Sequence, residues 1–197
     1  MEKVLISRIN HHANAHDFLN NHQFGFTPQK GTTDVVMEIK NYVMEGLAEG
    51  EVIALISLDV KGAFDAAFWP SILNGLRACG CPKNLYNLTK SYFSNRTAIL
   101  SSNSIQIEKE VSRGCPQGSC CGPGFWNIQY NSLLNLPFRE NTKVVAFADD
   151  LILAIRAGST RAVENYSNGE LTKITAWSKR NNTIFNDEKS KVMLISR

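Results

Sequence analysis

The 197-residue sequence has no apolar run approaching the roughly 20 residues needed to span a bilayer. Its first ten residues, MEKVLISRIN, do not form a secretory signal peptide, and no internal repeat or low-complexity tract is visible. These absences argue against a membrane, secreted or repeat protein. We therefore expect an intracellular protein with no membrane partner.

Excess charge and paired cysteines are also lacking. Lysine and arginine number 21 against 18 acidic residues, a formal charge of +3, which permits nucleic-acid binding without indicating it. The five cysteines form no CxxC pair, so free thiols are predicted. A zinc site is the alternative, since His12 and His16 lie one helical turn apart with His11 and His22 nearby, but no cysteine pair has zinc-finger spacing.

What the sequence does contain is a mixture of helical and strand patterns. Apolar residues spaced three or four apart predict helices over residues 3–20, 34–49, 70–76, 85–93, 126–134 and 163–177. Runs of β-type residues predict strands over residues 52–58, 97–100, 105–111, 143–148, 151–155 and 191–196. Helices and strands do not alternate strictly. We therefore expect an α+β fold, with helices on one face of a mainly antiparallel sheet.

Local signals predict where some elements end. Thr32 or Thr33 is expected to cap the second helix, and Gly50 to end it. The strands on either side of residues 101–104 should form a hairpin. Residues 113–124, RGCPQGSCCGPG, are too rich in glycine and proline for regular structure and are expected to form a loop.

Carboxylates follow two of the apolar strands. Asp59 comes directly after strand 52–58, and the pair Asp149-Asp150 separates two apolar runs at the tip of a strand–turn–strand unit. If these strands are neighbours, three carboxylates converge with no lysine or arginine expected to neutralise them, and each raises the pKa of the others. Divalent ions such as Mg²⁺ remove that penalty because they prefer carboxylate oxygens.

Such a carboxylate cluster suits phosphoryl transfer. Two metal ions ~4 Å apart can activate an attacking hydroxyl and stabilise the leaving oxygen of an in-line displacement. The alternative is structural, because an Asp-Asp pair in a hairpin is commonly only a turn and an aspartate after a strand commonly caps a helix. The spacing by itself leaves both interpretations open.

Five motifs surround these residues in a fixed order. They are HQFGFTPQKGTTD, SLDVKGAFDAAFWPSIL, SRGCPQGSCCGPGFWNIQYNSLL, VVAFADDLILA and FNDEKSKVMLIS. From about Arg8 to Ser196 the chain resembles the reverse transcriptases of non-LTR retrotransposons, especially the arthropod jockey and type-1 ribosomal-insertion groups. The resemblance implies a right-hand polymerase palm, an antiparallel sheet backed by helices. Residues 1–50 would form part of the fingers and 51–197 the palm with inserted fingers elements.

The resemblance implies roles at a catalytic centre. Asp59 and Asp149 match the family's metal ligands with Asp150 beside them, and the carbonyl of Val60 is expected to face a metal. Two Mg²⁺ ions are implied, which Mn²⁺ could replace. Phe64 matches the bulky side chain beneath the nucleotide sugar, where an aromatic ring would collide with a 2′-hydroxyl. Ordinary core packing is the alternative role of Phe64.

The resemblance also implies a nucleotide pocket. Gln117 and Gly118 lie in the motif that shapes this pocket, and Lys30 occupies the fingers position of a basic residue on the incoming triphosphate. Lys189 matches the basic residue of the last palm motif, which can neutralise or protonate the pyrophosphate leaving group. An ordinary turn and two solvated lysines are the alternatives.

Template contacts are implied at Gln23 and Phe26, in the fingers motif. The implied function is an RNA-directed DNA polymerase that extends a DNA primer on an RNA template with deoxynucleoside triphosphates, in the nucleus, the cytoplasm or both. The family's polypeptide is longer, and its thumb is expected to be absent here. A catalytically inactive remnant that at most binds nucleic acid is therefore the main alternative. A nucleotide cyclase, which needs no PQG loop, is another.

Overall fold

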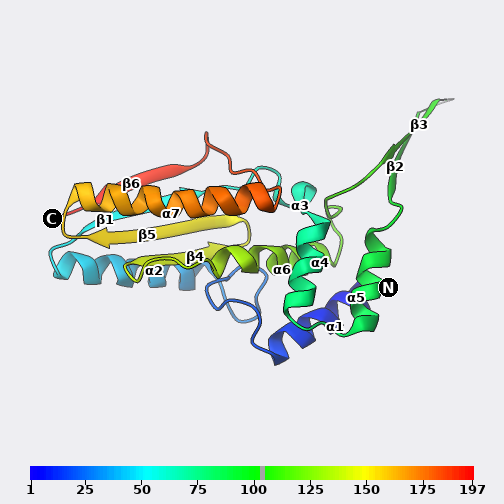
Figure 1. Cartoon of the computed structure of the whole chain (residues 1–197), viewed down its shortest axis with the longest axis horizontal. Helices are drawn as coiled ribbons and strands as arrows, with labels where there is room; N and C mark the ends of the chain where they lie inside the picture. Colours follow the sequence, from blue (N-terminus) through cyan, green and yellow to red (C-terminus); the bar gives the residue numbers. More distant parts are fainter. Residues whose placement is uncertain (103–104) are drawn as a thin grey trace.

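The computed structural model describes residues 1–102 and 105–197 (Figure 1). Its helices are α1 (Glu2–Ala15), α2 (Thr32–Ala48), α3 (Ala63–Ala66), α4 (Trp69–Ala78), α5 (Lys83–Phe93), α6 (Gly122–Leu134) and α7 (Thr160–Arg180). Its strands are β1 (Val52–Leu58), β2 (Thr97–Ser102), β3 (Ile105–Glu110), β4 (Thr142–Phe147), β5 (Asp150–Ala157) and β6 (Lys191–Ile195). The predicted α+β class is confirmed. Among the described residues, no helix has the length and apolar character required to cross a membrane.

The central sheet has four antiparallel strands in the order β4-β5-β1-β6. A two-residue turn joins β4 to β5. β5 then pairs with the whole length of β1. β6 pairs with the other side of β1. β1 therefore has a neighbour on each side, which agrees with its almost uninterrupted apolar sequence.

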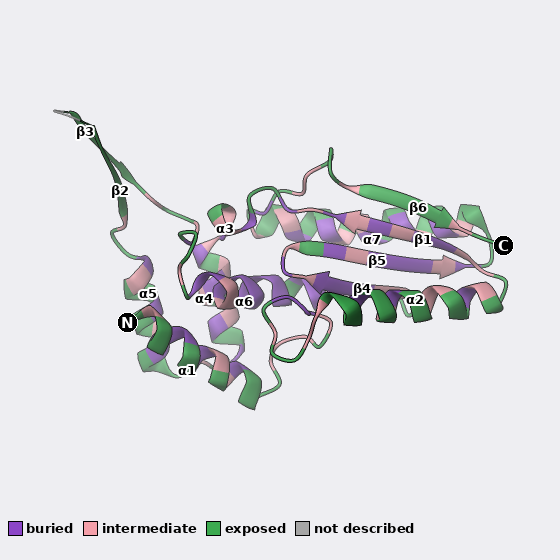
Figure 2. Ribbon diagram, turned by 180° about the vertical axis from the view of Figure 1, so that it is seen from behind, coloured by how far each residue is buried: buried purple, intermediate pink, exposed green. Residues whose placement is uncertain are grey.

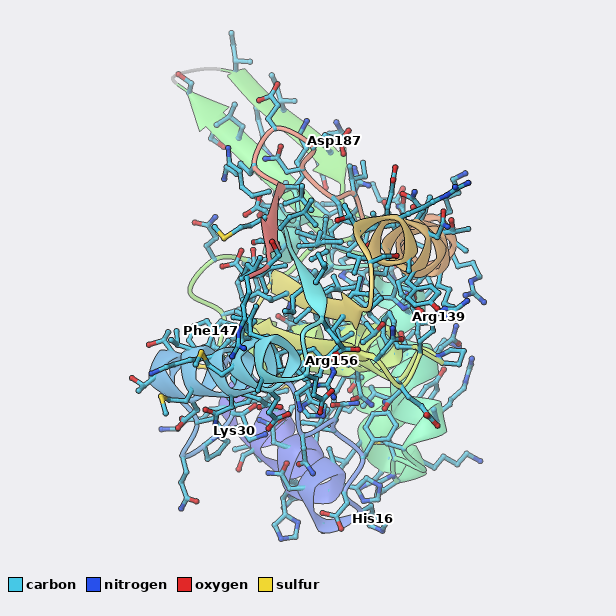
Figure 3. All side chains as sticks on the ribbon, turned by 90° about the vertical axis from the view of Figure 1, so that its left-hand side faces the viewer. His16, Lys30, Arg139, Phe147, Arg156 and Asp187 are labelled. Atoms are coloured by element: carbon cyan, nitrogen blue, oxygen red, sulfur yellow. The ribbon has the colours of Figure 1, made fainter. Side chains whose placement is uncertain are left out.

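Helices cover both faces of this sheet, as the view along the strands shows (Figure 3). Alternate residues of β5 point to opposite faces. Leu151 and Leu153 belong to the core cluster that includes α6 and α7, whereas Ala154 packs with residues of α2. The prediction that helices lie on one face only was therefore wrong. A helical spacing of apolar residues indicates that a helix has a buried side, but not which face of a sheet it covers.

Helices α1, α4 and α5 pack together beyond one end of the sheet, and α6 packs against α1, α4 and β4 (Figure 1). Trp69 of α4 stacks on Phe93 of α5 with 5.1 Å between ring centroids, and Phe93 lies 5.1 Å from Phe125 of α6. Ten of the thirteen residues of α6 are buried, so this helix is surrounded by protein. It joins the helical group to the sheet.

The β2–β3 hairpin projects from the body of the molecule, and all its described strand residues are exposed (Figure 2). The predicted hairpin is confirmed. Its predicted turn, residues 101–104, includes residues 103 and 104, which lie outside the described residues.

α1 ends at Ala15, five residues before its predicted end. Asp17 has a φ of +47°, and the amides of Asp17 and Phe18 bond to the carbonyls of Asn14 at 3.2 Å and Ala13 at 3.0 Å. This pair of bonds is a Schellman motif, which usually has glycine in the left-handed position. Aspartate occupies it here, so the usual signal for a helix end was missing.

The starts of α2 and α6 also differ from the prediction. Gly31, not a threonine, is the N-cap of α2, and the carboxylate of Asp34 accepts a hydrogen bond of 2.7 Å from the Gly31 amide. α6 starts at Gly122, inside the stretch that was predicted to be a loop. Pro123 is compatible with this start because its missing N–H would have no partner in the first turn of a helix.

Candidate active site

Three aspartates meet at one end of the central sheet. The pairing of β1 with β5 brings Asp59, the residue after β1, opposite Asp150, the first residue of β5. Asp149 lies beside them, in the two-residue turn that joins β4 to β5. The strands that bear these carboxylates are neighbours, so the condition under which the carboxylates converge is met.

The charges of these aspartates act on groups from two elements. The pKa of Asp150 is raised, first by burial and then by the negative charges of Asp149 and Asp59, while Lys189 opposes the rise. The phenol of Tyr130, in α6, has a pKa raised well above its ordinary value, first by burial and then by all three carboxylates. The three aspartates therefore form one region of negative potential.

A cation lies beside this cluster, so the prediction that no lysine or arginine would neutralise it was wrong. Nζ of Lys189 lies 3.7 Å from Oδ2 of Asp59, although the lysine side chain is 69% exposed. Backbone hydrogen bonds hold the loop that bears Lys189 against the residues that follow β1. The Asn186 amide donates to the Asp59 carbonyl at 2.7 Å, and the Lys61 amide donates to the Ile184 carbonyl at 2.8 Å. An ion pair this exposed contributes little to stability.

Within the part of the chain that the structure describes, no group of three or more His, Cys, Asp or Glu side chains is placed to hold a metal ion. The zinc alternative therefore has no support there, and His12 instead contacts the carbonyl of Cys79 at 2.9 Å. The same finding covers the three aspartates taken as one group, but a site with only one or two protein carboxylates lies outside its terms. Mg²⁺ keeps several waters and needs only one or two carboxylates, its other ligands being substrate phosphates.

Phe64 lies on α3, the single helical turn that follows Asp59 in the chain. Its ring is edge-on to Phe26 with 5.8 Å between centroids and tilted against Trp126 at 6.3 Å. The side chain is half-buried, so it packs against the core and still has an exposed part. Both of its predicted roles, core packing and contact with a sugar, are compatible with this position.

The loop after β3 bonds to the backbone of Phe64. The amide of Cys115 donates to the Phe64 carbonyl at 2.8 Å. Gly114 has a φ of +92°, and a Cβ there would lie 2.7 Å from the carbonyl oxygen of Asp65, so the loop requires glycine at this position. Gln117 is exposed, as is Gly118 that follows it. Their nucleotide contacts stay a prediction.

Lys30 and Val60, two other predicted site residues, both make contacts within the protein. The ammonium of Lys30 donates to the carbonyl of Asn21 and lies 4.9 Å from the ring centroid of Phe24. Burial lowers the pKa of Lys30. Val60 is buried and forms a one-residue antiparallel bridge with Phe185. Their predicted contacts with triphosphate and metal stay predictions.

The side chains that bond to the turn between β4 and β5 were not predicted from the sequence. From α6, Nε1 of Trp126 donates to the Ala148 carbonyl at 3.0 Å, and the hydroxyl of Tyr130 donates to the Asp149 carbonyl at 3.1 Å. Gln23, predicted to contact the template, is 3% exposed and bonds to the same turn. Helical periodicity indicated that the two aromatic residues are buried, but not where their polar atoms point.

Comparison with known proteins is decisive for the family. The profile of the family described as "Reverse transcriptase (RNA-dependent DNA polymerase)" matches residues 1–197. The chain belongs to the reverse transcriptase family. The family predicted from the five motifs is thereby confirmed, and members of this family generally use divalent metal ions.

Relatives of this reverse transcriptase chain come from insect retrotransposons. It is 33% identical over 174 residues to a putative 115 kDa protein in the type-1 retrotransposable element R1DM of Drosophila melanogaster, covering 88% of this chain and 16% of that protein. It is 34% identical over 159 residues to a Pol polyprotein from the type-1 element R1 of Bradysia coprophila, covering 81% and 15%. For the RNA-directed DNA polymerase of the mobile element jockey of Drosophila melanogaster, identity is 25% over 195 residues, covering 96% and 21%. The chain thus spans only a small part of these relatives, and the predicted resemblance to both groups is confirmed.

Solved structures of similar fold include telomerases. Apo telomerase of Candida tropicalis truncated from its C-terminal domain matches with a TM-score of 0.72 and 14% identity, over 98% of this chain and 40% of that one. Telomerase of Candida albicans in complex with a TWJ fragment of telomeric RNA matches with a TM-score of 0.67 and 13% identity, over 98% and 34%. At these identities the likeness shows the fold alone. The fold is that of a right-hand polymerase, and the predicted palm is confirmed.

Proposed function

We propose that this chain is the polymerase core of an RNA-directed DNA polymerase from a non-LTR retrotransposon. It extends the 3′-hydroxyl of a DNA primer on an RNA template, using deoxynucleoside triphosphates. The observation that supports this most directly is the convergence of Asp59, Asp149 and Asp150 in a chain of the reverse transcriptase family. The chain spans 15–21% of the relatives described above, so the activity and partners of the whole protein are part of the proposal.

In this reaction the primer O3′ forms a bond to the α-phosphorus while the bond from that phosphorus to the leaving oxygen breaks. The primer hydroxyl loses a proton and pyrophosphate departs. Two Mg²⁺ ions, or Mn²⁺ in their place, would neutralise charge on both oxygens. Asp59, Asp149 and the Val60 carbonyl would hold them, with Asp150 adding negative charge. Lys189, beside Asp59, is placed to neutralise the leaving pyrophosphate.

The nucleotide would lie beside Phe64, whose ring excludes a 2′-hydroxyl and so favours deoxyribonucleotides. Gln117 and Gly118 would contact the nucleotide from the neighbouring loop, and Phe26 the template. Lys30 could reach the triphosphate only by exchanging its bond to the Asn21 carbonyl for phosphate oxygens.

Architecture and location are wider parts of the proposal. Residues 1–50 are proposed to act with the fingers, although α2 packs on β1, β4 and β5 of the palm sheet. An RNA template and a chromosomal DNA target would place the reaction inside the cell, in the nucleus, the cytoplasm or both.

Primer extension tests the proposal. Purified chain would be given a DNA primer, an RNA template, deoxynucleoside triphosphates and Mg²⁺, beside an Asp149→Asn control. We expect template-dependent extension that is lost in the control and on chelation of the metal. Incorporation without a template would instead support a nucleotidyl enzyme of another kind, such as a cyclase. Nucleic-acid binding without extension would support the inactive remnant.

A further inference from the structure

The turn that presents Asp149 has an unusual backbone. Ala148, the first of its two residues, has a φ of +58°. Residues with a Cβ seldom adopt this conformation, and two-residue turns that need it usually contain glycine or asparagine. The conformation therefore depends on contacts from the surrounding protein.

Gln23 supplies contacts to both sides of Ala148. Its Nε2 donates to the Ala148 carbonyl at 3.2 Å, and its Oε1 accepts from the Ala148 amide at 3.2 Å and from the Gly25 amide at 2.9 Å. The side chain is buried, and its residue is 3% exposed. One amide group thus bonds the two peptide groups on either side of the residue with positive φ.

The segment around Gln23 is itself fixed against β4. The Phe24 amide donates to the Ala146 carbonyl at 2.8 Å, and the Ala146 amide donates to the His22 carbonyl at 2.8 Å, which together form a parallel bridge. A Cβ on Gly25 would lie 2.0 Å from the Ala148 nitrogen, so the segment approaches the turn closely. Gln23 therefore cannot shift along β4 without breaking these bonds.

We propose that Gln23 is a positioning residue for the catalytic turn. By holding the Ala148 amide and carbonyl it sets the direction in which the next residue, Asp149, leaves the turn. This inference rests on the proposed function, because it treats Asp149 as a metal ligand. It replaces a template contact for Gln23, since both ends of the buried amide are bonded within the protein.

The first test is Gln23→Glu, which keeps the shape of the side chain and removes the Nε2 donor. Gln129→Glu is a matched control, because Gln129 is equally buried and bonds the Phe68 amide and the Thr183 hydroxyl instead. Gln23→Met, uncharged and similar in length, keeps the test valid if the buried carboxylate unfolds the chain.

Two readouts are needed. Tb³⁺ binding, followed through luminescence sensitised by Trp126 and Tyr130 with Asp149→Asn as site control, reports the carboxylate cluster without requiring catalysis. We expect Gln23→Glu to weaken Tb³⁺ binding and lower kcat by about 10- to 100-fold, the range for residues that orient metal ligands, with template Kd and nucleotide KM unchanged.

Weaker template binding with unaltered Tb³⁺ affinity would overturn the inference. If wild-type chain binds Tb³⁺ but extends no primer, the proposed function fails and the Tb³⁺ comparison still decides the role of Gln23.

A double variant separates this role from general stability. Glycine adopts a positive φ without a steric penalty, so Ala148→Gly makes the turn less dependent on Gln23. We expect Ala148→Gly to restore part of the Tb³⁺ affinity that Gln23→Met loses. An equal loss in both backgrounds would show that Gln23 does not act through Ala148.

Discussion

Single side chains join parts of this protein that are distant in sequence, and Glu2 is an example outside the aspartate cluster. Its carboxylate accepts hydrogen bonds from the Tyr92 hydroxyl at 2.6 Å, the Ser119 hydroxyl at 3.0 Å and the Cys120 amide at 3.3 Å. It thereby ties α1 to α5 and to the loop before α6. These bonds, that of Tyr92 above all, lower the pKa of Glu2 from 4.5.

A group whose pKa is lower in the folded than in the unfolded chain stabilises the fold above its unfolded pKa. The contribution of Glu2 should therefore be complete above about pH 4.5 and disappear as the pH falls through its lower folded value. We expect Glu2→Gln to lower the Tm near pH 7 and to differ less from wild type near pH 3. Thermal unfolding followed by circular dichroism between pH 3 and pH 7 measures this difference in Tm. Glu164→Gln, on the exposed side of α7, is the control, and a Tm difference for Glu2→Gln that grows in acid would contradict the prediction.

Phe64 allows a second prediction at the residue scale. Replacing its ring by the smaller side chain in Phe64→Val should open space beside the nucleotide sugar. Discrimination of deoxyribonucleotides from ribonucleotides should then fall by about 10- to 100-fold, measured as the ratio of kcat/KM values. Phe64→Tyr keeps the ring and should keep the discrimination. Equal ratios in wild type and Phe64→Val would assign Phe64 to core packing.

At the scale of elements, the sequence predicted interiors better than ends. β1 was predicted over its observed residues because an apolar run ends abruptly at Asp59. The end of α1 was missed because Asp17, not glycine, takes the left-handed position of its Schellman motif. α3 was not predicted, since a helix of four residues is too short to show a period.

The end of α1 leads to a stability prediction. Asp17→Gly should raise the free energy of unfolding by about 0.5–1 kcal/mol, because a Cβ in the left-handed region costs about 1 kcal/mol or more and part of this gain is lost to the flexibility of glycine in the unfolded chain. Urea unfolding measures it. Asp17→Ala keeps a Cβ and loses the polar group, so it should be no more stable than wild type. A less stable glycine variant would indicate that the aspartate side chain stabilises the turn.

At the scale of the whole molecule, the site exists only because distant segments converge. The ends of β1 and β4, the start of β5, the segment around Gln23 and the loop bearing Lys189 all meet at one end of the palm sheet. The elements approach it from both faces, since α6 lies on one side and α2 on the other. Phe147, beside the turn, lies on the α2 side (Figure 3).

Convergence of three carboxylates implies mutual repulsion in the metal-free protein. We therefore expect metal-free Asp149→Asn to be no less stable than wild type. Adding Mg²⁺ should raise the Tm of wild type more than that of the variant, because an ion that binds only the folded chain stabilises it by mass action. Differential scanning calorimetry with EDTA and with Mg²⁺ measures both effects. A lower metal-free Tm for the variant would point to a structural partner of Asp149.

The sequence by itself determined the class of fold and the family, because strand and helix periods and the five motifs are local patterns that can be recognised in one sequence. Only the tertiary structure decided which helix covers which face, that Lys189 lies beside Asp59, and that Gln23 holds Ala148. The physical reason is that these contacts join residues more than a hundred positions apart or elements on opposite faces. Their distances depend on how the whole chain packs, and no local pattern records them.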